Sequence, residues 1–464
     1  MVTRHSAVVG STGSGKSTTV SSIVQSISDP SRFPSARIVL FDMHGEYARA
    51  LGASANVFTI DATRVSGAHE LSVPFWALTF DELVPLLFGS IADDAGRAYV
   101  RDLTTELKRA SFKRKSVAGL NKAEINADSP VPFSVRTLWF ELHVLLNATH
   151  TAAGGQSQAT WALLEDAAGN PIEPGDSERV VAPIFQTQTQ SAGAAKVYLS
   201  TSPLNIRRAV DVLGSRLRDR RFDFALSPSV WSPSKKGKTA QDLDTLLEAW
   251  LGLDRSVTIV DLSGVPPAVA TDIVGSMTRV IYDAMFWARN FSEGSRERPV
   301  LFIFEEAHAY LGETRSAAAK SAVQRIVREG RKYGMGAMIV SQRPSEIDPT
   351  ILSQCGTLIA MRLTNTADRA HVSAAAADNL KGILSMLPIL RTGEAIILGE
   401  SVPLPMRALI TLPQSLPDSR DPAVVSGAMP GGWDRKREPS DYSLVVQAWR
   451  AQNQNSPSIL KGKD

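Results

Sequence analysis

The sequence feature that most limits how this chain can fold is an octapeptide near its start, Gly10-Ser11-Thr12-Gly13-Ser14-Gly15-Lys16-Ser17. It fits the pattern G-x-x-x-x-G-K-[ST] in full, directly after an apolar, strand-like run and directly before a helical pattern. Glycines at these positions let successive backbone N–H groups close around an anion at the N-terminus of a helix. A flexible Gly-Ser linker is the alternative, but it does not account for Lys-Ser-Thr in this setting. The segment therefore predicts a strand, a phosphate-binding loop and a helix in that order.

The chemistry expected of this loop is the binding of ATP together with Mg²⁺. Lys16 is expected to reach the β- and γ-phosphates, and the hydroxyl of Ser17 is expected to bind the metal ion. The predicted nucleotide-binding residues are Gly10, Ser11, Thr12, Gly13, Ser14, Gly15, Lys16, Ser17 and Thr18. Nucleotide binding is the first function that the sequence predicts.

Short apolar runs typical of buried parallel strands recur along the chain, and helical patterns follow many of them. Strands buried on both faces, with crossover helices between them, predict a doubly wound, mainly parallel α/β sheet. A nucleotide then belongs at the carboxyl edge of the strands. The expected strands are Ser6 to Gly10, Arg37 to Asp42, Val257 to Ser263, Pro299 to Glu306, Ala337 to Gln342 and Thr357 to Leu363.

Paired carboxylates stand at the end of one of these strands, where Val300 to Phe304 runs into Glu305 and Glu306. In P-loop ATPases the first acidic residue typically supports the Mg²⁺ shell and the second polarises the attacking water, because hydrolysis needs a positioned nucleophile. We therefore assign Glu305 to the metal, through a water molecule, and Glu306 to catalysis. Asp is usual at the first position, so Glu305 is a departure. A solvated acidic turn is the alternative interpretation.

An arginine follows the next predicted helix, which runs from Ser321 to Glu329 and ends at Gly330. Arg331 lies just past that end, where it could project across a subunit boundary and stabilise charge on a transferring phosphoryl group. A solvated helix face or contacts to a phosphate backbone are equally compatible with the sequence here. The neighbouring basic residues are Arg325, Arg328 and Lys332.

Two other strand ends carry polar residues. Gln342 ends a buried strand, where it either faces the γ-phosphate and senses hydrolysis or is an ordinary strand-end amide. Asp42, His44 and Glu46 alternate in the loop after another strand. A metal site from these three is conceivable, but such alternation more often forms a loop beside the nucleotide.

The chain divides into four segments on these patterns. Residues 1–78 and 255–412 are expected to be the two parts of a nucleotide-binding core, and 413–464 is a Pro- and Gly-rich tail with a short helix at Ser443 to Ala451. Residues 79–254 are expected to hold a helical insertion followed by irregular connecting segments. The helices expected there are Asp81 to Phe88, Ala95 to Ala110 and Val135 to Leu146, and the long surface loops or short strands are Ala148 to Ser200 and Pro228 to Lys238.

Composition sets outer limits on the class of protein. With 464 residues, 43% of them apolar and 21% charged, the chain is neither disordered nor a disulfide scaffold. Its single cysteine, Cys355, excludes an intrachain disulfide, which agrees with a reducing cytoplasm. No apolar run reaches the roughly 18 to 20 residues that a membrane span needs. We expect a cytoplasmic protein with no membrane partner.

Taken together, these motifs resemble the HerA branch of the FtsK/HerA P-loop ATPases. The resemblance covers about residues 5–90 and 255–412. The segments that carry it are Gly10 to Thr18, Asp42 to Tyr47, Val257 to Gly264 (VTIVDLSG), Glu305 to His308, Arg328 to Gly334 (REGRKYG), Ser341 to Ser345 (SQRPS) and the stretch from Ile351 (ILSQCGTLIAMRL). Their order and spacing make the set specific.

The resemblance implies a RecA-like (ASCE) P-loop NTPase fold and a catalytic motor. The family forms hexameric rings that thread double-stranded DNA and hydrolyse ATP at subunit interfaces. By that resemblance Arg331 becomes the preferred finger supplied in trans, and Gln342 becomes the preferred sensor. Family members usually carry a small N-terminal β-barrel, whereas the P-loop strand here begins within about five residues of Met1. We therefore expect either a truncated chain or a branch without the barrel.

The resemblance also implies partners. In archaea the family partners a nuclease in DNA end processing, and bacterial relatives pair with nuclease-like or sirtuin-like effectors in phage defence. The leading hypothesis is an ATP-driven, hexameric motor on double-stranded DNA that serves such an effector. A nucleotide-regulated ring scaffold that activates an effector, with little translocation, is the runner-up. A secretion or conjugation ATPase of the same superfamily is disfavoured by the missing membrane segment.

Support for DNA contact is diffuse. Basic clusters on a surface release counterions from phosphates and predict binding without sequence preference. Solvated helix faces are the equal alternative for each cluster, and no recognition-helix or zinc-finger signature is present. The clusters are Lys108-Arg109 with Lys113-Arg114-Lys115, Arg207-Arg208, Arg216 through Arg221, and Lys235-Lys236-Lys238.

Overall fold

A computed structural model describes residues 2–52, 54–62, 67–112, 120–155, 157–189, 195–200, 204–252, 255–312, 317–375, 381–418, 433 and 442–451. All six predicted strands are confirmed within a few residues at their ends. Four further strands, β3, β4, β11 and β12, were not predicted. The strands of the main sheet are β1 (Ser6–Val9), β2 (Arg37–Asp42), β3 (Ala55–Thr59), β4 (His69–Glu70), β7 (Val257–Asp261), β8 (Val300–Phe304), β9 (Met335–Ser341), β10 (Thr357–Ala360), β11 (Glu394–Gly399) and β12 (Met406–Leu409).

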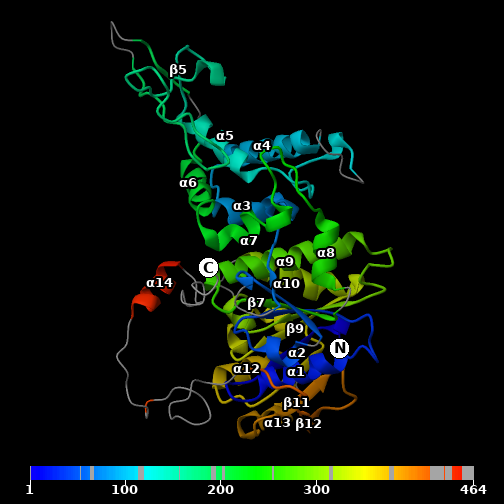
Figure 1. Cartoon of the computed structure of the whole chain (residues 1–464). Coiled ribbons are helices and arrows are strands. Elements are labelled where there is room, and N and C mark those ends of the chain that lie inside the picture. The colour runs from blue at the N-terminus through cyan, green and yellow to red at the C-terminus, as the bar shows by residue number, and fades with distance from the viewer. Residues whose placement is uncertain are drawn as a thin grey trace.

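These strands form one sheet, part of which is labelled in Figure 1. Within the described part of the chain their order is β12-β11-β10-β1-β9-β8-β2-β7-β3-β4. Every pairing from β10 to β4 is parallel, whereas β10–β11 and β11–β12 are antiparallel. The predicted doubly wound, mainly parallel sheet is thereby confirmed, with an antiparallel pair added at one edge. All of its strands come from the stretches before residue 71 and after residue 256.

Helices cover both faces of the sheet. Alternate residues of the central strands enter two separate cores: Ala7 and Val39 belong to one, and Val8 and Leu40 to the other. This alternation follows from the period of two in a strand, with both faces apolar. The second core is closed by α1 (Lys16–Ile27) and α2 (Tyr47–Leu51), and the first by α9 (Pro267–Trp287) and α10 (Ala317–Glu329). The remaining helices after β9 are α11 (Pro349–Leu352), α12 (Thr366–Ala375) and α13 (Lys381–Leu384), with α14 (Ser443–Ala451) near the end of the chain.

Strand order brings the predicted site residues to one edge of the sheet. β9 lies between β1 and β8, so it separates the strand before the P-loop from the strand before the two carboxylates. In register, Val9 stands beside Ser341 and Phe304 beside Ile339. Because the three strands are parallel, their carboxyl ends meet at the same edge. This is the RecA-like arrangement expected from the sequence.

A helical insertion follows the first part of the sheet and stacks over the α9 and α10 side (Figure 1). Its first helix begins with a capping box in which Thr79 and Glu82 satisfy each other's backbone N–H groups. The three predicted helices are confirmed, and three more follow. The helices here are α3 (Phe80–Phe88), α4 (Asp94–Phe112), α5 (Val135–Asn147), α6 (Arg207–Arg216), α7 (Asp223–Leu226) and α8 (Leu243–Leu251). None of the helices in the described ranges is both long enough and apolar enough to cross a membrane.

The stretch from 148 to 200 projects from the far end of this insertion (Figure 1). It was predicted as long surface loops or short strands, and that prediction is confirmed. Its regular structure in the described residues is the antiparallel pair β5 (Thr149–His150) and β6 (Tyr198–Leu199), isolated bridges around it and a short 3-10 helix at Gln158–Thr160.

A buried lysine fixes the insertion internally. Lys108 in α4 is 0% exposed; its Nζ donates to the carbonyls of Ala127 (2.7 Å) and Ser129 (2.6 Å) and lies over the ring of Phe133. Burial lowers the pKa of Lys108 to about 7. We expect Lys108→Met to lower stability by about 1 to 3 kcal/mol, because two buried carbonyls lose their donor. Thermal and urea unfolding followed by circular dichroism measure this, with the exposed Lys196→Met as control. Equal stability of both variants would contradict it.

Candidate nucleotide site

The P-loop has the backbone that its glycines were expected to allow. Gly13 and Gly15 adopt positive φ angles of 70° and 98°, and α1 starts at Lys16 directly after them. A Cβ on Gly10 would lie 2.6 Å from the Ser14 hydroxyl and 2.8 Å from Cβ of Met361. L-residues rarely adopt such φ values, and there is no room for a side chain at Gly10. The sequence therefore folds this segment into an anion cradle at a helix N-terminus.

Residues that sequence reasoning missed donate hydrogen bonds to carbonyls of the P-loop. Arg362 Nη2 and Thr392 Oγ1 donate to the carbonyl of Gly13 at 3.3 and 3.1 Å, and the Gly393 N–H donates to the carbonyl of Ser14 at 2.9 Å. Arg362 follows β10, and the other two lie in the turn before β11. These donors occupy loop carbonyls, which leaves the loop N–H groups for an anion. No sequence signal distinguishes Thr392 or Gly393 from ordinary turn residues.

Lys16 lies inside the cradle. Its Nζ is 3.4 Å from the carbonyl of Ser11, within the loop itself. Burial lowers the pKa of Lys16, and the charges of Glu306, Glu305 and Glu46 oppose that shift. These carboxylates therefore face Lys16 across the site, as the sequence prediction requires.

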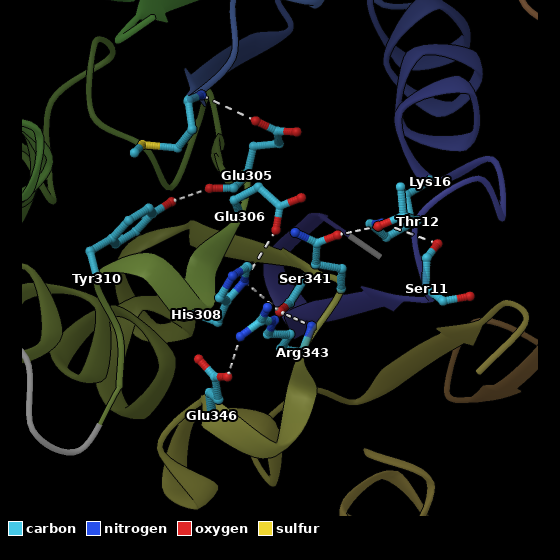
Figure 2. A network of polar contacts seen from close by, with 12 residues as sticks. Ser11, Thr12, Lys16, Glu305, Glu306, His308, Tyr310, Ser341, Arg343 and Glu346 are labelled. Carbon is cyan, nitrogen blue, oxygen red and sulfur yellow. Dashed lines mark hydrogen bonds and ion pairs between the residues drawn. The ribbon is translucent and has the colours of Figure 1, made fainter. Parts of the chain in front are cut away.

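The two carboxylates after β8 point in different directions (Figure 2). Glu306 has a left-handed backbone conformation (φ 45°, ψ 45°), which is uncommon for a residue with a side chain. Strained conformations of this kind concentrate at functional sites. This turn of the backbone places the Glu305 and Glu306 side chains in two different environments.

Glu305 lies among other acidic groups. It is 3% exposed, and its Oε2 accepts from the Met43 N–H at 3.1 Å. Burial, followed by the charges of Asp42 and Glu306, raises the pKa of Glu305 well above its ordinary value. A divalent cation next to this group would remove that electrostatic cost, and oxygen ligands are what Mg²⁺ prefers. The residues present thus fit Mg²⁺ held by Ser17 and by Glu305 through water.

Asp42 has a structural role that the sequence left open. Its Oδ1 accepts from the backbone N–H groups of His44, Gly45 and Glu46, and its Oδ2 from that of Tyr47 at 3.0 Å. The carboxylate therefore fixes the loop before α2. Across the described residues, no group of three or more His, Cys, Asp and Glu side chains is arranged to hold a metal ion.

Glu306 faces the nucleotide side of the site. Its Oε2 lies 3.1 Å from Nδ1 of His308 (Figure 2). Burial works to raise the pKa of Glu306, but the neighbouring side chains of His308 and Lys16 hold that pKa below its ordinary value. Glu306 is therefore a carboxylate at neutral pH, as a residue that polarises water must be. Glu306 Oε2 is itself buried without a hydrogen-bond partner in the described residues.

The two remaining predicted residues lie at opposite ends of β9. Gln342 follows the carboxyl end, and its Oε1 accepts from Thr12 Oγ1 in the P-loop at 2.7 Å. Arg331 lies in the turn Gly330–Tyr333 before the strand, and its charge contributes, after burial, to lowering the pKa of His5 to about 4. A strand of seven residues spans roughly 20 Å at about 3.3 Å each. Gln342 thus touches the site, whereas Arg331 is exposed at the opposite edge of the sheet.

Several residues of the predicted basic clusters are engaged within the fold. Lys108 is buried, and Lys113-Arg114-Lys115 lies outside the described residues. Several guanidinium groups donate to backbone carbonyls or pair with a carboxylate inside the insertion. These are Arg109 (to Ile125), Arg207 (to Leu146), Arg216 (to Pro85), Arg218 (to Val180) and Arg221 (with Asp219). These arginines and Lys108 are therefore already engaged inside the protein.

Comparison with known proteins identifies the family to which the motifs belong. Residues 1–281 match the protein family described as "Helicase HerA, central domain", and residues 287–415 match "Helicase HerA-like C-terminal". The chain is 37% identical over 153 residues to a "Probable helicase MJ1565" of Methanocaldococcus jannaschii, covering 33% of this chain and 28% of that protein. It is 30% identical over 193 residues to the "DNA double-strand break repair helicase HerA" of Sulfolobus acidocaldarius, covering 42% of this chain and 38% of that one. Each match thus spans well under half of the relative.

The fold is shared more widely. VirB4 of Thermoanaerobacter pseudethanolicus superposes with a TM-score of 0.50 at 12% sequence identity, covering 88% of each chain. At that identity the likeness concerns the fold alone.

Proposed function

The chain belongs to the HerA helicase family, and from that membership we propose that it is an ATP-hydrolysing motor that moves along double-stranded DNA without sequence preference. The ATPase proposal rests on the arrangement of side chains at one edge of the sheet. There Glu306 faces Lys16 while Gln342 contacts Thr12 in the P-loop. We assign residues 1–78 and 255–412 to the ATPase core, 79–254 to the insertion and connecting segments, and 413–464 to the tail.

Each residue has a distinct task in this proposal. The loop N–H groups from Gly10 to Thr18 bind the phosphates, and Lys16 binds the β- and γ-phosphates. Mg²⁺, when bound by Ser17 and by Glu305 through water, supplies positive charge at the phosphates. Glu306 orients the attacking water and accepts its proton. Gln342 reports the presence of the γ-phosphate.

A ring of subunits completes the site in this proposal. Arg331 lies at the edge of the sheet opposite its own P-loop, so it can reach a nucleotide only on another copy of the chain. This position supports its role as a finger in trans, and a closed hexamer places one such residue at every interface.

We propose a protein effector as the second partner, either a nuclease or a sirtuin-like protein. The two proteins would act in DNA end processing or phage defence in the cytoplasm. A cavity of about 1210 Å³ between α5 and the projecting 148–200 stretch offers it a surface. Its acidic residues outnumber its basic ones, and such a surface repels DNA phosphates. The charged residues that line it are Glu141, Glu173, Asp176, Glu178, Arg179 and Lys235. The same cavity favours the alternative of a nucleotide-regulated scaffold, in which the effector is the main target.

The proposal is tested by ATP hydrolysis with and without linear double-stranded DNA. We expect DNA to stimulate hydrolysis, and Lys16→Ala to weaken ATP binding about tenfold or more, because a charge-assisted contact to the phosphates is lost. Lys196→Ala, an exposed lysine outside the site, is the control. Hydrolysis that ignores DNA but needs a second protein would favour the scaffold. A Lys16→Ala protein that binds and hydrolyses ATP normally would refute the ATPase proposal.

A further inference from the structure

Two neighbouring residues in the loop after β2 each bury a polar atom that no group in the described residues bonds. These atoms are Oε2 of Glu46 and the phenol oxygen of Tyr47. Tyr47 is 0% exposed and is the first residue of α2. Buried polar atoms are normally hydrogen-bonded, because an unpaired one gives up its bonds to water and gains none in return. Two such atoms side by side therefore indicate a place where a ligand supplies the missing bonds.

The backbone that carries these two side chains is fixed from both sides. Asp42 accepts from the N–H groups of Glu46 at 3.2 Å and Tyr47 at 3.0 Å, and the carbonyl of Glu46 accepts from the Asp418 N–H at 2.9 Å. Helix α2 lies beside α1, which starts at Lys16 of the P-loop (Figure 1). The loop is therefore a fixed wall of the nucleotide site.

The phenol of Tyr47 has the two proposed Mg²⁺ residues as neighbours. Burial, followed by the charges of Glu305 and Asp42, raises the pKa of Tyr47 well above its ordinary value, and the Ser17 hydroxyl opposes that shift. An effect of this kind requires proximity, because it falls off with distance. The buried phenol oxygen thus points into the part of the site where Ser17 and Glu305 meet.

The carboxylate of Glu46 faces the same part of the site. Its charge is among those that oppose the lowering of the Lys16 pKa by burial. After burial and the charges of Asp42 and Glu306, it also adds to the raised pKa of Glu305. Glu46 therefore lies between the lysine that binds the phosphates and the carboxylate assigned to Mg²⁺.

The chemistry of the two side chains suits a hydrated cation. Mg²⁺ bound beside phosphates usually keeps several of its waters, and the Glu46 carboxylate can only accept the hydrogen bonds that such waters donate. A Ser17 hydroxyl that gives its lone pair to the cation must direct its hydrogen elsewhere, and the phenol oxygen of Tyr47 can accept it.

We propose that Glu46 and Tyr47 are positioning residues for Mg²⁺, in which Glu46 holds a water of the metal shell and Tyr47 orients the Ser17 hydroxyl. This role rests on the proposed ATPase function and adds a third side to its metal site. Asp42 then has a purpose beyond the loop itself, because it places both residues.

Tyr47→Phe removes the buried hydroxyl and keeps the ring. Binding of a fluorescent ADP analogue is measured with Mg²⁺ and with EDTA, and the ratio of the two affinities gives the enhancement by Mg²⁺. We expect the enhancement to fall about 10- to 100-fold, as when other outer partners of a metal site are removed. The melting temperature without nucleotide should not fall, because the lost hydroxyl has no partner in the fold. Tyr198→Phe, a partly buried tyrosine on β6, is the control.

Glu46→Gln gives a second, independent measurement with an effect of opposite sign in EDTA. Affinity without the metal should rise, because a negative charge that faces Lys16 and the phosphates is lost, while the enhancement by Mg²⁺ falls about 10- to 100-fold. A carboxylate that only repels phosphates would raise affinity equally in both conditions and leave the enhancement unchanged. Glu297→Gln, an exposed glutamate before β8, is the control.

An unchanged enhancement in either variant would overturn the proposal. In Tyr47→Phe, that result together with a lower melting temperature would assign the hydroxyl to the fold. If the unaltered protein binds no nucleotide, the ATPase proposal fails and the inference falls with it. Mg²⁺-dependent binding by the unaltered protein, matched by both variants, defeats the inference alone.

Discussion

Glu306→Gln is expected to reduce ATP turnover about 10²- to 10⁴-fold while ATP still binds. Gln has the shape of Glu but no negative charge, so it cannot accept the proton of the attacking water. The phosphates are bound by the loop and Lys16, which the substitution leaves in place. Removing a carboxylate that faces Lys16 should, if anything, strengthen phosphate binding. Single-turnover hydrolysis and equilibrium binding of a fluorescent ATP analogue separate the two effects.

A matched control lies at the other end of the same strand. Glu297 is exposed before β8, and Glu297→Gln removes one carboxylate without touching the site. Turnover within about twofold of the unaltered protein is expected for it. Glu305→Gln should differ from both, because it raises the Mg²⁺ concentration needed for half-maximal rate. Comparable losses of turnover and binding in Glu306→Gln would mean that Glu306 supports the fold of the loop and does not act on water.

The central sheet is predictable from sequence because its strands carry their own signal. Strands buried on both faces are continuous apolar runs, and six of them were identified on that basis. β12 is different, because it is an edge strand in which Met406 is 46% and Leu409 is 75% exposed. An edge strand with exposed positions lacks the apolar pattern, so it is recognised only by its pairing with β11.

The site was predictable where one residue type at one spacing is required, as in the P-loop. Contacts between segments that are distant in sequence could not be predicted. Arg362 and Thr392 reach Gly13 across more than 340 positions of sequence, and Ser341 meets His308 across 33. Such contacts depend on strand order and on which way a side chain turns. Local sequence encodes neither, so residues that support the loop or lie beside Glu306 emerge only from the fold.

Burial also changes how the basic residues are understood. Lys108 and Arg216 look like parts of a DNA-binding surface in the sequence, yet they donate to carbonyls inside the insertion. A charged donor that is hydrogen-bonded to an internal carbonyl is not available to bind DNA phosphates. The DNA-binding surface that we propose would therefore use basic residues other than these. The sequence alone cannot tell the two uses apart, because both place Lys or Arg on amphipathic helices.

Arg331→Ala is expected to reduce ATP turnover about 10³- to 10⁵-fold, the range seen when a finger that stabilises the transferring phosphoryl group is removed. The side chain is exposed at the edge of the sheet opposite its own P-loop. Its loss should therefore leave ATP binding to isolated subunits unchanged. Arg328→Ala, an exposed arginine within the preceding helix, is the control and should retain turnover. Steady-state hydrolysis, measured at protein concentrations high enough for the proposed rings to form, gives the comparison.

Mixed rings decide whether Arg331 acts on a neighbour. A Lys16→Ala subunit has a disabled loop but an intact Arg331, and an Arg331→Ala subunit has the reverse. Random mixing in equal amounts gives about a quarter of interfaces with both an intact loop and an intact finger across from it. Hydrolysis should then rise well above that of either variant alone. A finger acting within its own subunit would leave every site incomplete and the mixture inactive. The position of Arg331 before β9, with the P-loop after β1 at the other edge, is the physical reason to expect recovery.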